Sequence, residues 1–152
     1  MRTIKFRGYS LFGDRWVYGR SIFNIGTVCS ICEDEEVEKS LLENRGALGV
    51  SVDPETVGQF TGFYDKDGKE IYEGDIVFVD MYSDEKSFKA FVEWQEEYGC
   101  FVFVEKTLIQ DKDGVEEVID GETYYYSKEI CKTIKVIDNI YKDCYNSYRT
   151  KN

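Results

Sequence analysis

The sequence predicts a mainly β protein, either all-β or a β-rich α+β fold, from two observations. Short runs of alternating apolar and polar residues recur along the chain, and turn residues such as Asp-Gly separate them. Alternation with period two is typical of half-buried antiparallel strands. The 42% hydrophobic and 16% aromatic content of the 152 residues argues against disorder and predicts one core in a single domain.

The first part of that domain, residues 1–51, is expected to hold N-terminal strands and a variable segment. Strand-like runs occur in TIKFRGY (3–9), RWVYGRSIF (15–23) and TVCSI (27–31). Residues 34–44 predict one short helix, because acidic residues begin it, Val37 and Leu41 are four residues apart, and Gly46 follows. An acidic solvated loop is the alternative for this segment.

The second part, residues 52–152, is expected to form an antiparallel, barrel-like meander. Asp53-Pro54 favours a turn, residues 57–63 are extended, and the two DKDG stretches (65–68 and 111–114) predict hairpin turns because glycine accepts positive φ. Strands are predicted in DIVFVDMY (75–82), FKAFVEW (88–94), CFVFVEKTLI (100–109) and KTIKVI (132–137). The bend at Gly74-Asp75 before IVFV is a frequent opening of small SH3-like barrels, a fold that hosts many functions.

Charge is distributed unevenly. The net charge is −11, but residues 1–23 hold five basic residues and one acidic residue, a balance of +4 that leaves −15 for the remainder. An acidic body repels nucleic acid, so direct nucleic-acid binding is disfavoured. The basic segment is expected to contact acidic surface of its own chain or of a second copy, or else to form a phosphate-facing patch. Its partner-facing candidates are Arg2, Lys5 and Arg7.

Catalytic and metal sites are limited by the absence of histidine. Without it, the usual general base, every Ser-His or Cys-His pair and every histidine metal ligand are missing. CSIC at 29–32 has the spacing of half a zinc site or of a redox pair, but no second CxxC occurs. We therefore expect Cys29 and Cys32 to be ordinary reduced thiols, and we predict no catalytic, cofactor-binding or metal-binding residues.

Tyrosines concentrate in TYYYSKE at 123–129, which lacks the basic residues of a nucleic-acid stacking platform. They are expected to alternate between core and rim. Because tyrosine is favoured at protein interfaces, Tyr124 and Tyr126 are candidates for a partner-facing patch. No apolar run is long enough to span a membrane, and the first residues lack a signal-peptide core, so the cytoplasm is the expected compartment.

Several of these motifs together resemble the YopX family of phage and prophage proteins. They are IKFRGYS followed by RWVYG (4–19), VDPETVGQFTGFYDKDGKEIYEGDIV (52–77), FVEW (91–94) and IDNIYKD (137–143). The resemblance implies a mainly β fold with GDIV entering a small barrel, and a setting in the bacterial cytoplasm. It implies no catalytic residues. Residues 24–51 match no family motif, so a function particular to this chain can lie there.

Two functions follow as expectations. The first is a non-enzymatic phage or prophage accessory protein that acts through protein–protein contacts, with homo-oligomers possible. The second is an acidic inhibitor that imitates nucleic acid and occupies a host DNA-handling enzyme, a hypothesis based on the −15 body.

Overall fold

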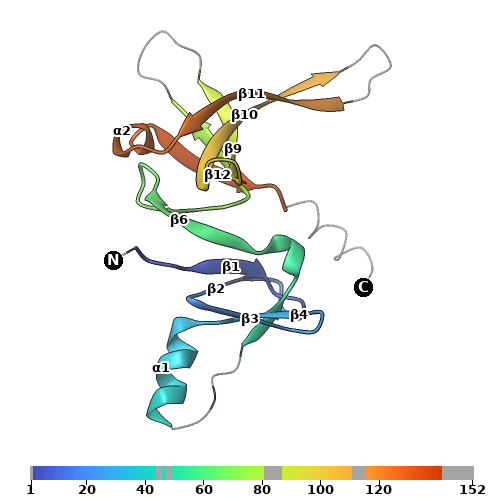
Figure 1. The fold of residues 1–152 in the computed structure, drawn as a ribbon, viewed down its shortest axis with the longest axis vertical. Coiled ribbons are helices and arrows are strands. Elements are labelled where there is room, and N and C mark those ends of the chain that lie inside the picture. The colour runs from blue at the N-terminus through green and yellow to red at the C-terminus, as the bar shows by residue number, and fades with distance from the viewer. Residues whose placement is uncertain (1, 44–45, 47–48, 81–86, 111–115, 142–152) are drawn as a thin grey trace. The chain divides into compact units, whose positions relative to one another are not determined.

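The structure is a computed structural model that describes residues 2–43, 46, 49–80, 87–110 and 116–141 (Figure 1). Side chains are described for these residues except 108–110 and 116–119. The chain forms two compact units, Met1–Gly62 and Phe63–Asn152. Both contain antiparallel sheets, and the prediction of a mainly β fold is confirmed.

The first unit contains two groups of paired strands. In one, β1 lies between β2 and β6, and in the other β4 lies between β3 and β5. Their bounds are β1 Phe6–Tyr9, β2 Trp16–Gly19, β3 Ser21–Ile25, β4 Val28–Cys32, β5 Val50–Val52 and β6 Gly58–Tyr64, of which the last two residues, Phe63 and Tyr64, belong to the second unit. Four fully or almost fully buried residues form the core of this unit: Val17, Cys29, Ile31 and Val52.

The strand-like run at residues 15–23 forms two strands, β2 and β3, which are divided after Gly19. The chain leaves one sheet after Gly19, which pairs with Phe6, and joins the other at Ser21, which pairs with Cys32. A Cβ on Gly19 would lie 1.9 Å from the carbonyl oxygen of Cys32, so only glycine fits at this crossing. The close approach of the Cys32 carbonyl to Gly19 therefore divides residues 15–23 into two strands, although their alternating pattern is continuous.

The predicted helix at 34–44 is confirmed as α1, Asp34–Leu42. Its first turn holds Asp34, Glu35 and Glu36, and its last turn holds Lys39, which suits the helix dipole. The turn predicted at Asp53-Pro54 is a short 3₁₀ helix, η1 Pro54–Thr56, in which the Asp53 side chain accepts a hydrogen bond from Glu55 N at 3.0 Å.

The second unit is built on a five-stranded antiparallel sheet with the order β11-β10-β9-β8-β12, which curls into half of a barrel. Whether this sheet is an SH3-like barrel stays a prediction. The second unit consists of β7 Glu70–Tyr72, which is not part of this sheet, β8 Asp75–Val79, β9 Phe88–Gln95, β10 Cys100–Gln110, β11 Glu116–Tyr125, α2 Lys128–Cys131 and β12 Ile134–Asn139. Its core holds Ile71, Val77, Val79, Ala90, Val92, Phe103, Ile134 and Val136.

Two buried aspartates fix the turns that lead into this sheet. Asp65 accepts hydrogen bonds from Asp67 N and Lys69 N at 2.9 Å and from Val136 N at 3.0 Å. Asp75 accepts one from Tyr72 N at 2.9 Å. The turn predicted at 65–68 and the bend predicted at Gly74-Asp75 are thus confirmed, whereas the second DKDG, at 111–114, lies outside the described residues.

Candidate protein-interaction surface

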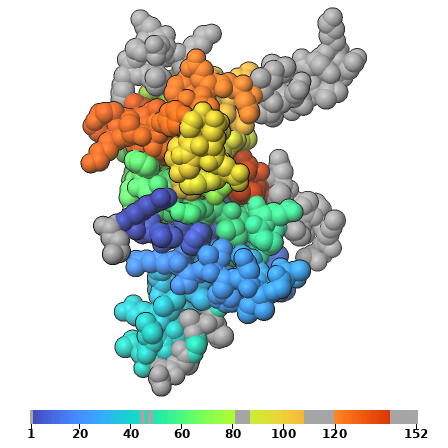
Figure 2. Space-filling model, in the orientation of Figure 1, coloured from blue at the N-terminus to red at the C-terminus, as the bar shows by residue number. Residues whose placement is uncertain are grey.

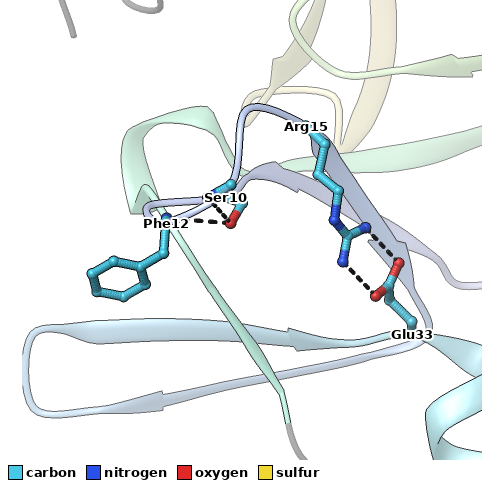
Figure 3. A network of polar contacts seen from close by, with 5 residues as sticks. Ser10, Phe12, Arg15 and Glu33 are labelled. Atoms are coloured by element: carbon cyan, nitrogen blue, oxygen red, sulfur yellow. Dashed lines mark hydrogen bonds and ion pairs between the residues drawn. The ribbon is translucent and has the colours of Figure 1, made fainter. Parts of the chain in front are cut away.

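The loop between β1 and β2 presents the most exposed large apolar side chain of the described residues, Phe12 at 90%. The loop is ordered from inside by Ser10, whose hydroxyl oxygen accepts hydrogen bonds from Phe12 N at 3.3 Å and Gly13 N at 3.0 Å (Figure 3). Ser10 N donates to the Arg15 carbonyl at 3.0 Å, which closes the loop. Phe12 is therefore held on a defined backbone while its ring projects away from the loop.

Two side-chain contacts tie the loop to the rest of the first unit. The guanidinium of Arg15 donates two hydrogen bonds to the carboxylate of Glu33, at 2.8 and 2.7 Å (Figure 3). This paired geometry raises the pKa of Arg15 and lowers the pKa of Glu33. The Tyr9 hydroxyl also donates to Asp14. Sequence reasoning noted Arg15 only as part of a basic segment, because its acidic partner lies 18 residues away.

The strand register places further apolar residues on one face of the β3-β4-β5 sheet. Phe23 pairs with Ser30, which pairs with Ser51, and Leu11 N donates to the Ser51 carbonyl at 3.0 Å. In the next row with the same orientation, Ile25 pairs with Val28. This face is opposite to the one that carries Cys29, Ile31 and Val52 into the core, because side chains alternate along a strand.

The residues on that outer face are exposed to a substantial degree. On that face Phe23, Ile25 and Val28 are 38, 71 and 47% exposed. Leu11 and Phe12, 48 and 90% exposed, belong to the loop that Leu11 N joins to Ser51 of the same sheet, and we call the five residues together the apolar surface. In the space-filling view, the blue atoms of the β3–β4 hairpin lie at the surface of the first unit (Figure 2). Single exposed apolar residues are ordinary, but a group of them on one face of a small sheet is a candidate interaction site.

The second unit carries a smaller exposed aromatic group at the β9–β10 turn. Trp94 packs edge-on against Phe101, with ring centroids 5.0 Å apart, and Tyr98 packs edge-on against Tyr125 at 6.0 Å. Trp94, Tyr98 and Tyr125 are 43, 57 and 53% exposed. Tyrosine and tryptophan are enriched in protein interfaces, so this group is a second candidate contact region.

The structure places the two tyrosines predicted as partner-facing against the core of the second unit. Tyr124 stacks on Phe88 and Tyr126 stacks on Phe63, both with ring centroids 4.8 Å apart. The exposed member of the series is Tyr125. The expected alternation between core and rim is confirmed, and the residue on the rim is the one between the two that were named.

The basic candidates lie in different environments. Arg2 is exposed, Lys5 lies 5.8 Å from the ring centre of Tyr18, and Arg7 is 5% exposed with its guanidinium 4.7 Å from the ring centre of Trp16. Such stacking over an aromatic face stabilises a cation. The three residues therefore do not form one uniform charged patch.

The thiols of the CSIC motif lie within β4. Residues three apart in a strand are about 10 Å apart and face opposite sides of the sheet, so Cys29 and Cys32 cannot share one metal ion. Both are buried, and burial raises the pKa of each thiol. Among the described residues, no group of three histidine, cysteine or carboxylate side chains is placed to hold a metal.

One lysine of the second unit lies between two carboxylates. Lys106 Nζ is 2.9 Å from Glu93 and 2.5 Å from Asp120, and its side chain is 13% exposed. Burial works to lower the pKa of Lys106, but the hydrogen bonds to Asp120 and Glu93 outweigh it and the pKa is raised. A lysine that acts as a general base needs a lowered pKa, so this group serves as an ion pair between strands.

Comparison with models of known protein families matches residues 5–145 to the family described as YopX protein. No curated protein matches the chain. In the part of the chain that the structure describes, no helix has the length and apolar character that a membrane span requires.

Proposed function

The chain belongs to the YopX protein family, and we propose that it is a non-enzymatic accessory protein of a phage or prophage that acts in the bacterial host through protein–protein contact. The phage or prophage setting rests on the family resemblance. The contact function rests on one observation, the 90% exposed ring of Phe12 on an ordered loop, which Leu11 N joins to Ser51 of the sheet that exposes Phe23 and Ile25.

Order in the loop matters because binding costs free energy when it immobilises flexible groups. The hydrogen bonds to Ser10 and the Arg15–Glu33 pair already restrict the backbone on both sides of Phe12. A partner with an apolar pocket would therefore gain the burial of an aromatic ring without ordering the loop. Aromatic anchors of this kind carry most of the binding energy in many interfaces.

Affinity capture from a host lysate tests the proposal with three forms of the full chain. The intact protein and the Leu42→Ser variant, which removes an 83% exposed leucine from α1, should retain the same partner. Phe12→Ser should lose that partner by about tenfold or more, the usual effect of removing a central aromatic anchor. Equal retention by all three forms would contradict the assignment of Phe12 as the anchor.

Imitation of nucleic acid remains the alternative. It requires carboxylates spaced like phosphates along an exposed stripe. At the start of α1, Glu33 pairs with Arg15 and Asp34 pairs with Arg20, with the latter at 3.1 Å. These contacts favour the first proposal, because they engage carboxylates that a stripe would need. Inhibition of a host nuclease by the intact protein and equally by Phe12→Ser would favour the alternative.

A further inference from the structure

The strand β3 is an edge strand with unusual composition. It pairs with β4 on one side, and no described strand pairs with its other side. Its residues, SIFNI, include no charged side chain and no proline. Edge strands of natural proteins are normally protected by lysine, proline or a bulge, because their free backbone groups can pair with another strand.

We propose that β3 pairs with β3 of a second copy of this chain in an antiparallel, two-fold symmetric arrangement. Centring the pair on Phe23 sets Phe23 against Phe23, Ser21 against Ile25 and Ile22 against Asn24. The two three-stranded sheets then form one six-stranded sheet, and the outer faces carrying Phe23, Ile25 and Val28 become continuous. A central aromatic pair and the burial of Ile25 stabilise this contact.

The absence of charged side chains on β3 favours β3 of a second copy as the strand that pairs with it. In the symmetric register no side chain within β3 meets a like charge, and the flanking Arg20 is paired with Asp34 of its own chain. The edge strands of the second unit do carry charged side chains, Asp120 and Glu122 on β11 and Lys135 and Asp138 on β12, which protect an edge against pairing with another strand. Of these three edge strands, β3 alone has no charged side chain.

This inference goes beyond the proposed function, because Phe12 lies outside β3 and remains available to a different partner. It also predicts a particular salt dependence. Each chain carries a net charge of −11, so two copies repel one another at low ionic strength. Near physiological ionic strength, salt screens this repulsion between charges more than about 8–10 Å apart, so added salt should strengthen the dimer.

Sedimentation equilibrium of the full chain over a range of concentrations tests the proposal. The intact protein and Phe12→Ser should form the same dimer. Ile25→Lys should weaken it by about a hundredfold, since each of two symmetric sites loses roughly a factor of ten. Leu42→Lys makes the same charge change on α1 and should leave the dimer intact. A protein that stays monomeric at every concentration and salt level, or an equal loss in the two lysine variants, would overturn the proposal.

Cysteine pairing tests the register independently of stability. A cysteine at Phe23 would face its own copy across the two-fold axis, with Cα atoms about 4.5–5.5 Å apart, which a disulfide can bridge. A cysteine at Asn24 would lie diagonal to its copy, about 7–8 Å away, which is too far. Mild oxidation should therefore join Phe23→Cys chains and leave Asn24→Cys chains unjoined relative to the intact protein. Equal joining of both variants, or of neither, would overturn this register.

Discussion

Replacing Gly74 with alanine should destabilise the second unit through two separable effects. Gly74 has a φ of 78°, a conformation that costs an L residue about 1–2 kcal/mol. A Cβ there would also lie 2.6 Å from Cε2 of Tyr141, and overpacking of this kind costs about 1–3 kcal/mol. The free energy of unfolding should therefore fall by about 2–5 kcal/mol.

Urea denaturation followed by tryptophan fluorescence measures this loss. The chain has two tryptophans, so a Trp16→Phe background leaves Trp94 to report on the second unit alone. Gly68→Ala is the matched control, because Gly68 has a φ of 81° but a Cβ there would meet nothing within 4 Å. It should lose only the backbone part, about 1–2 kcal/mol.

The two effects can be separated by a second change. Adding Tyr141→Ala to the Gly74→Ala variant should remove the overpacking cost while the backbone cost remains. Equal losses for Gly74→Ala and Gly68→Ala would refute the steric argument about Tyr141. A loss below about 0.3 kcal/mol for both glycines would refute the argument from backbone conformation as well.

Two further predictions concern titratable groups. Because the hydrogen bonds from Arg15 lower the pKa of Glu33 in the folded state, its contribution is present above the ordinary glutamate pKa and is lost as pH falls through the lowered value. Glu33→Gln should remove about 0.2–1 kcal/mol at neutral pH, since both side chains are partly exposed, and should reduce the loss of stability on acidification. Burial raises the pKa of Cys131 to about 11, so native Cys131 should react with a thiol reagent far more slowly than Cys100, which is partly exposed.

One result would contradict each of the predictions for Glu33 and Cys131. Identical acid unfolding curves for Glu33→Gln and the intact protein would show that the ion pair contributes nothing to stability. For the thiols, labelling at pH 8 and mapping by mass spectrometry should find Cys131 unmodified until the protein is denatured. Modification of native Cys131 as fast as Cys100 would contradict its burial.

The sequence predicted those elements whose signal is local. Alternation located β9 and β10, acidic residues and Gly46 located α1, and Asp-Gly and Gly-Asp pairs located turns in which Gly68 and Gly74 have positive φ. Each of these depends on a preference of neighbouring residues. These elements can be predicted without knowing which distant residues they contact.

Elements that depend on distant partners were not predicted. The strands β5 and β7 have three residues each, too short for alternation to be distinctive. The helix α2 is a single turn, begun by the Ser127 hydroxyl accepting from Ile130 N at 3.1 Å. The division between β2 and β3 is imposed by the carbonyl of Cys32, 13 residues after Gly19. Such constraints are tertiary.

The candidate surface was missed for a related reason. Period-two alternation assigns Phe23 and Ile25 to one face of a strand, but it cannot say which face the fold buries. The core of the first unit takes the opposite face of the sheet, through Cys29, Ile31 and Val52. Phe12 gave no pattern at all, because its exposure depends on the loop that Ser10 closes.

Net charge and the apolar surface have opposing effects on association. A charge of −11 keeps copies of the chain apart at long range, which disfavours contacts that bury little apolar area. Within the first unit, Arg15 and Arg20 pair with Glu33 and Asp34, so attraction between the basic segment and a second copy is weakened. Phe6 and Arg7 of β1 pair with β2 on one side and with β6 on the other, so these two residues offer no free strand edge to a neighbour either. A contact strong enough to overcome the repulsion must therefore draw on apolar burial and backbone pairing, and in the first unit β3 provides both.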